Sequence, residues 1–167
     1  MNVQEIDRIA AAIYDAPLGE YIGRDGAGIL AEHAANERLL KNNEFLYRKG
    51  ETTNSFYIVT EGRLALVRER SEDAKELIVH VLEKGDLAGE LSFIDQTPHT
   101  LSVYALGEAA VLRFKSDDIK PLITEHPELI YNFMRAVVKR VHSVVNVVGQ
   151  HEMEMAQYIL TGGRGRG

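Results

Sequence analysis

The sequence predicts a mainly-β domain with flanking helices, in which short strands form a barrel, roll or sandwich and a long helix follows at the C-terminal end. Three observations carry this prediction. Residues 38–114 contain short runs of β-branched, aromatic and leucine residues. Turn dipeptides such as Asn42-Asn43 and Glu61-Gly62 separate these runs, as in closely spaced hairpins. After Phe114 the strand pattern gives way to helical spacing.

The strands of this β region are predicted to be short. The hydrophobic runs place them at residues 56–59, 64–68, 77–82, 102–105 and 109–114. Short strands joined by tight turns favour an all-β unit over alternating βαβ units.

The N-terminal segment is predicted to be an amphipathic helix. Its apolar residues repeat at the spacing of one helix face: Ile6, Ile9, Ala10 and Ile13. Asn2 and Glu5 have the spacing of a capping box. Pro17 and glycines at 19, 23, 26 and 28 then predict a loop, before a second short helix from Ile29 to Asn36.

Two helices are predicted after the strands. Ser116 is expected to cap the first helix, whose first turn is acidic. Pro127 lies in the first turn of the second helix, which is expected to run to about Leu160. The chain is therefore divided into an N-terminal helix and loop (1–28), the β region (29–125), a long helix (126–160) and a flexible tail (161–167).

The long helix carries a heptad pattern. Seven residues fall at alternating steps of four and three: Val137, Val141, Val144, Val148, His151, Met155 and Tyr158. Further apolar residues lie on its other faces: Phe133, Met134, Val138, Val145 and Val147. One interpretation packs the helix on its own β domain. Because one small domain has trouble covering all these faces, we expect a homodimer formed through this helix.

Composition and charge narrow the function classes. A chain of 167 residues has room for one proper core. The net charge of −6 disfavours a phosphate backbone as partner, so no direct DNA binding is expected. The absence of cysteine excludes disulfides and thiolate sites. With no apparent signal peptide and no apolar run long enough to span a membrane, we expect a cytoplasmic protein without membrane contact.

The segment Gly85-Asp86-Leu87-Ala88-Gly89-Glu90-Leu91-Ser92 joins a strand to a short helical turn. A glycine lets the backbone approach a ligand closely, and backbone N–H groups at a helix start bind anions. Glu90 could accept hydrogen bonds from sugar hydroxyls. The alternative is a turn that ends a strand and carries a solvated glutamate.

The order of motifs around this segment resembles the cyclic-nucleotide-binding domain family. The motifs are Gly50-Glu51, residues 56–59 with Glu61-Gly62, the 85–92 segment, two strands, a capped helix, His126-Pro127 and a long helix. The family includes sensor halves of catabolite-activator-type regulators, regulatory subunits of kinases and gating domains of channels. The resemblance covers about Leu30 to Val148. It implies a β-roll of the double-stranded β-helix or jelly-roll type, a binding rather than catalytic function, and cAMP or cGMP as candidate ligand.

The resemblance also implies site residues. Gly89 and Glu90 stand where the family places a glycine and a glutamate that contacts the ribose 2′-hydroxyl. The backbone amides of Leu91 and Ser92 would face the cyclic phosphate. His99 stands where the family has a phosphate-binding arginine, and Thr100 follows it. Losing that charged partner costs about 1.5–3 kcal/mol, on the order of ten- to a hundredfold in affinity.

The histidine leaves three interpretations open: weak cyclic-nucleotide binding, a different small ligand, or a degenerate domain kept for dimerisation and assembly with no nucleotide ligand. A protonated His99 could replace the arginine, so that affinity for anions rises as the pH falls; the alternative is an exposed loop histidine. The resemblance also implies that the long helix closes over the base, and by its distance from Pro127, Arg140 is the polar residue best placed for that role. It could equally be a solvated charge beside Lys139 and Arg135.

Other function classes have less support. A metal-binding enzyme of cupin type would need converging ligands, and only His80, Glu83 and Glu90 are near one another in sequence. We expect no metal, no cofactor and no catalytic residues. Few residues follow Met155, too few for a helix-turn-helix module. A regulatory domain of this kind needs another protein as its downstream partner, which the sequence does not identify.

Overall fold

The computed structural model describes residues 1–35, 37–68 and 76–160. The predicted end of the second helix at Asn36 and the predicted tail at 161–167 lie outside the described residues. So do the side chains of four heptad residues, which are Val148, His151, Met155 and Tyr158.

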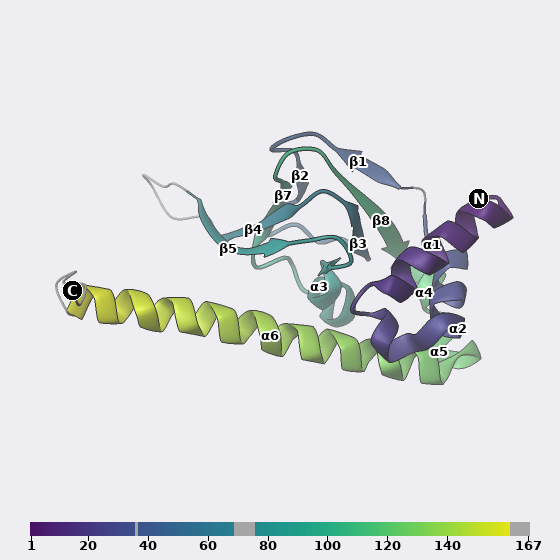
Figure 1. The fold of residues 1–167 in the computed structure, drawn as a ribbon. Helices are drawn as coiled ribbons and strands as arrows, with labels where there is room; N and C mark the ends of the chain where they lie inside the picture. Colours follow the sequence, from purple (N-terminus) through teal and green to yellow (C-terminus); the bar gives the residue numbers. More distant parts are fainter. Residues whose placement is uncertain (36, 69–75, 161–167) are drawn as a thin grey trace.

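Two four-stranded antiparallel sheets form the β-roll (Figure 1). One sheet has the order β1 (Arg38–Leu40), β8 (Ala109–Lys115), β3 (Ser55–Glu61) and β6 (Leu87–Ala88). The other has the order β2 (Phe45–Tyr47), β7 (Ser102–Ala105), β4 (Leu64–Arg68) and β5 (Leu77–Leu82). The mainly-β prediction with flanking helices and a long C-terminal helix is confirmed.

The five predicted strands are all present, three of them with the predicted bounds. The sequence did not predict β1, β2 and β6, which have two or three residues each. Strands of this length are too short to show a period of two, so only their pairing partners define them.

β3 is buried on both faces, and its side chains alternate between two cores. Phe56 and Ile58 point into a core shared with the helices. Tyr57 and Val59 point into the interior of the roll. The alternation follows from the period of two along a strand, and it makes β3 the wall between the roll and the helices.

The N-terminal helix is confirmed as α1 (Val3–Asp15), and the Asn2 side chain accepts a hydrogen bond from the Glu5 backbone N–H at 2.9 Å. The loop predicted between residues 17 and 28 is wrong. α2 (Gly19–Glu32) occupies most of it, with a single kink at Gly23, whose φ is +66°. Gly26 lies inside this helix, and the position requires glycine because a Cβ there would lie 2.9 Å from the Ile22 and Leu129 side chains. This glycine serves close helix packing, which a local turn rule cannot anticipate.

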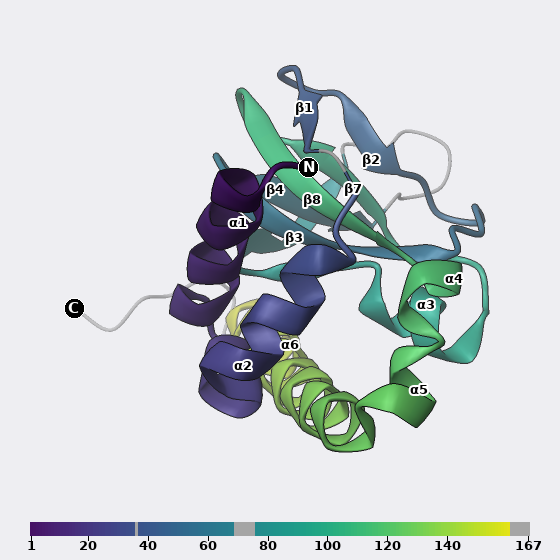
Figure 2. The same ribbon diagram turned by 90° about the vertical axis from the view of Figure 1, so that its right-hand side faces the viewer.

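Three helices follow the roll: α4 (Ser116–Ile119), α5 (Leu122–Glu125) and α6 (Pro127–Leu160). The Ser116 cap is wrong, since Ser116 is the first helical residue and the extended Lys115 precedes it without a side-chain cap. The Ser116 backbone N–H instead donates to the Asn54 carbonyl at 2.9 Å. The start of α6 at Pro127 is confirmed. α2 and α5 flank its N-terminal end, and its C-terminal half runs out alongside the roll (Figures 1 and 2).

The first heptad residues of α6 face their own domain. Val137 is buried in the core shared by helices and sheet, Val141 packs against it, and Val144 lines a cavity against the roll. The intramolecular interpretation therefore holds for this part of the seam. Among the described side chains of α6, the exposed apolar ones are Tyr131, Met134, Val138, Val145 and Met153. The first three are spaced by three and four and lie beside Tyr21 of α2, whereas Val145 borders the cavity.

Phe56 joins the roll to the helices. Its ring is fully buried and lies 4.7 Å from the Phe114 ring centroid, 5.0 Å from Phe93 of α3 (Glu90–Asp95) and 5.0 Å from Phe133 of α6. Four elements therefore meet on one side chain.

We expect Phe56→Ala to destabilise the protein by about 3–5 kcal/mol, since it removes a large buried ring and leaves a cavity. Chemical denaturation measures the change. Leu39→Ala shortens an exposed apolar side chain of β1, and it should change stability by less than about 0.5 kcal/mol. Equal effects of the two substitutions would contradict this role of Phe56.

Candidate functional site

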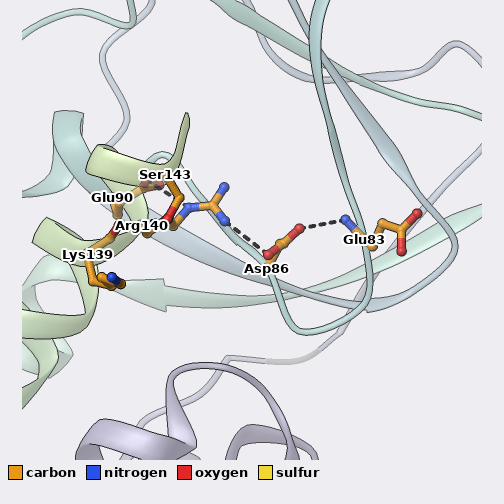
Figure 3. A network of polar contacts seen from close by, with 6 residues as sticks. All are labelled: Glu83, Asp86, Glu90, Lys139, Arg140 and Ser143. Carbon is orange, nitrogen blue, oxygen red and sulfur yellow. Dashed lines mark hydrogen bonds and ion pairs between the residues drawn. The ribbon is translucent and has the colours of Figure 1, made fainter. Parts of the chain in front are cut away.

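A tight turn after β5 positions the predicted ligand segment. Gly85 has a φ of +90°, and its N–H donates to the Val59 carbonyl at 2.8 Å. The Asp86 carboxylate accepts a hydrogen bond from the Glu83 backbone N–H at 2.8 Å through Oδ2. The turn thus directs the other carboxylate oxygen of Asp86 toward α6 (Figure 3).

Gly89 starts the next bend, where β6 passes into the short helix α3. Its φ is +76°, and a Cβ there would lie 3.4 Å from His99, Tyr47 and the Ser55 carbonyl. A side chain would be strained by the backbone conformation and crowded by these neighbours. The glycine therefore lets Glu90, the next residue, sit buried at the floor of the site.

All seven predicted site residues line one cavity of about 230 Å³ between the roll and α6; they are Gly89, Glu90, Leu91, Ser92, His99, Thr100 and Arg140. Glu90, Ser92 and His99 are buried, whereas Leu91 and Thr100 are exposed at the rim. The Ser92 hydroxyl donates to the Thr97 carbonyl and so ties α3 to the segment that carries His99. The structure brings the predicted residues together; their contact with a ligand stays a prediction.

Arg140 links α6 to the ligand segment (Figure 3). Its Nε lies 3.2 Å from Glu90 Oε1, and its Nη1 lies 3.1 Å from Asp86 Oδ1. The Arg140 side chain is only 16% exposed. The solvated-charge interpretation is therefore wrong for Arg140, whereas Lys139 and Arg135 are exposed as it assumed.

His99 is buried rather than an exposed loop residue. It is 7% exposed, and its ring stacks on Tyr47 with centroids 3.7 Å apart. Its Nε2 lies 2.8 Å from the Thr53 hydroxyl. Burial lowers the pKa of His99 below its ordinary value, and the nearby Glu51 carboxylate offsets this in part. Burial raises the pKa of Tyr47, so its phenol stays neutral.

The sequence prediction missed several residues of the site, among them Tyr47 and Asp86. Tyr47 lies on β2, which was not predicted, so nothing marked its side chain as pointing inward. Asp86 belongs to the quoted motif but was given no role. The sequence did contain a signal for Asp86: two carboxylates four residues apart on one turn can pair with the same cation.

The metal-site alternative gains no support from the described residues. Within 1–35, 37–68 and 76–160 there is no group of three histidine or carboxylate side chains that could hold a metal ion. In the same part of the chain, no helix combines the length and the hydrophobicity that crossing a membrane requires.

The site is thus a cavity between a β-roll and a long helix, with Gly89 and Glu90 at its floor. The model of the cyclic nucleotide-binding domain family matches residues 37–126, which is more than half of the chain. The chain belongs to this family. Domains of this family are regulatory rather than catalytic.

Curated relatives contain this domain as one part of a longer chain. Lysophospholipase NTE1 of Cryptococcus neoformans is 30% identical over 105 residues, which cover 61% of this chain and 6% of the enzyme. The CRP-like cAMP-activated global transcriptional regulator of Mycobacterium tuberculosis is 26% identical over 101 residues, covering 60% of this chain and 45% of the regulator. The chain thus spans less than half of either relative.

Solved structures share the fold. The regulatory domain of Toxoplasma gondii PKA with cAMP superposes with a TM-score of 0.71 at 18% identity, covering 84% of this chain and 51% of that one. The N-terminal domain of a transcriptional regulator from Streptomyces coelicolor has a TM-score of 0.67 at 28% identity, with 79% and 93% covered. The β-roll prediction is confirmed by these similarities.

His99 should make stability depend on pH. Its pKa in the folded state lies below the unfolded value of about 6.5, so the unfolded chain binds more protons as the pH falls through that value. Stability is then fully present above pH 6.5 and is lost toward lower pH. We expect the melting temperature to fall less between pH 7.5 and 5.5 in His99→Gln than in the wild type.

The exposed His126 supplies the control for this measurement. His126→Gln should keep the pH dependence of the wild type, because this side chain is in contact with water in the folded protein. If the melting temperatures of His99→Gln and the wild type fall equally between pH 7.5 and 5.5, burial of a neutral His99 does not cause the pH dependence.

Proposed function

We propose that this chain is a small-molecule-sensing regulatory domain. The ligand occupies the cavity beside Gly89 and Glu90, cyclic nucleotides bind it weakly, and α6 transmits the occupancy to a protein partner. The family membership supports the cyclic-nucleotide-sensing class. The position of all seven predicted residues around one cavity supports the location.

The Arg140 bridge is the observation that carries this proposal. A hydroxylated ligand beside Glu90 competes with Arg140 for the same carboxylate, since Arg140 Nε is bonded to Glu90 Oε1. The Asp86 contact then holds the guanidinium from one side only. A ligand that changes this balance favours a different position of α6, because a ligand shifts the equilibrium toward the state it binds better.

Weak binding of cyclic nucleotides follows from His99. A buried imidazole whose pKa is lowered offers no lasting positive charge at neutral pH. An arginine would offer two parallel charged donors to the phosphate. The protonated-His99 hypothesis therefore requires a pH below the ordinary range of histidine titration.

We expect cyclic AMP and cyclic GMP to bind with an affinity on the order of ten- to a hundredfold below that of the same site with arginine in place of His99. Calorimetric titration of the wild type and of His99→Arg at neutral pH measures the two affinities. Glu90→Gln removes the carboxylate at the floor of the cavity and should abolish the heat. Glu83→Gln makes the same change at an exposed position of the same turn, and it should leave binding intact.

No heat with either nucleotide in the wild type would instead favour the second candidate, a degenerate domain that serves in dimerisation and assembly. The exposed apolar face of α6, with Tyr131, Met134 and Val138, favours that candidate. The two functions are compatible, because the cavity and this face use different sides of the helix.

We propose that this exposed face, rather than the heptad seam beginning at Val137, forms the homodimer contact. A glutamate within an apolar seam costs the desolvation of its charge. We therefore expect Met134→Glu and Val138→Glu to raise the dimer dissociation constant by at least about tenfold, measured by sedimentation equilibrium. Val3→Glu introduces the same change at an exposed position of α1 and should leave the dimer unchanged. A monomeric wild type would refute the contact.

A further inference from the structure

The charge balance of the cavity bears on what it binds. Among the described lining residues, the carboxylic acids are Glu90 and Asp95 and the one guanidinium is that of Arg140, so acidic groups outnumber basic ones. Asp86 adds a further negative charge against the same guanidinium, at 3.1 Å. The positive charge of Arg140 is therefore already compensated before any ligand enters.

The Arg140 guanidinium is not free to serve an anion. Its Nε and Nη1 point to two different carboxylates, at 3.2 and 3.1 Å, and its side chain is 16% exposed. Turning it toward a phosphate would break one of these pairs and leave a partly buried carboxylate without its cation. Separating a buried ion pair in this way is costly.

His99 does not supply the missing charge. Its ring lies flat on Tyr47, its Nε2 faces the Thr53 hydroxyl, and it is 7% exposed. Adding a proton here would place a cation in a poorly hydrated position, and burial lowers the His99 pKa accordingly. At neutral pH the ring acts as an uncharged aromatic wall.

The remaining lining is mostly apolar. Leucine and valine side chains from the roll and from α6 surround Glu90 and Arg140. These side chains are Leu66, Leu82, Leu87, Leu101, Val144 and Val145. An anion that enters loses its hydration and gains no uncompensated cation, which is unfavourable. An uncharged ligand keeps the apolar contacts and can donate its hydroxyl hydrogens to Glu90.

We propose that the cavity selects uncharged, hydroxylated ligands with an apolar or aromatic body over anionic ligands of the same shape. This inference rests on the proposed function, because it concerns the same site. It assigns the weakness toward cyclic nucleotides to the phosphate itself, while base and sugar still fit.

Paired probes test the charge preference directly. Adenosine and cyclic AMP share base and sugar and differ in the cyclic phosphate, and guanosine and cyclic GMP form a second pair. Calorimetry at neutral pH should show each nucleoside binding at least about tenfold more tightly than its cyclic nucleotide. Equal or tighter binding of the cyclic nucleotides would overturn the inference while leaving the proposed function intact. If neither member of either pair binds, the proposed function fails and the inference with it.

Two variants change the charge in opposite places. His99→Arg adds a cation to the cavity wall, and Asp86→Asn removes one carboxylate from Arg140. Each should shift the nucleoside-to-cyclic-nucleotide affinity ratio toward the cyclic nucleotide by about tenfold or more. Asp117→Asn removes the same charge from the exposed first turn of α4, and it should leave the ratio unchanged. An unchanged ratio in Asp86→Asn, shown to be folded by its melting curve, would overturn the inference.

Discussion

The contact of one guanidinium with two carboxylates fixes the relation between the ligand segment and the long helix. The Arg140 guanidinium is largely buried, and Asp86 and Glu90 pair with its charge from the two ends of a single bend. The bend exists because Gly85 and Gly89 take positive φ angles. Backbone conformation, charge pairing and helix position are therefore one coupled arrangement (Figure 3).

The aromatic cluster around Phe56 provides the fixed reference for any movement. Phe133 holds the N-terminal part of α6 against the sheet, whereas beyond Arg140 the helix has mainly Val141 and Val144 against the roll. In the proposed mechanism, a change at the cavity moves the distal part of the helix, while the aromatic cluster keeps its N-terminal part in place. This arrangement suits the proposed sensor, because an aromatic cluster holds the N-terminal part of α6 and a few aliphatic contacts hold its distal part.

The sequence predicted the features that are local. Strands such as residues 64–68 and 77–82 have enough residues to show their type, and Pro127 marks a helix start by its own chemistry. The glycines of α2 misled the prediction because Gly26 is chosen by contact with Leu129, about a hundred positions away in the chain. In the site, the motif located Gly89 and Glu90. The burial of His99 and Arg140 could not be predicted, since it depends on Tyr47 of an unrecognised strand and on the rotation of α6 about its axis.

The replacement of arginine by histidine has a different meaning once the geometry is known. From the sequence alone, this replacement implies the loss of one contact with the phosphate. In the structure His99 completes an aromatic stack with Tyr47 beneath Gly89, and Arg140 is neutralised by carboxylates that also fix the helix. On the proposed charge preference, the carboxylates that would repel an anion are the ones that pair with Arg140 and hold α6 in place. A substitution that removes such a carboxylate to favour an anion therefore also weakens the contact between α6 and the ligand segment.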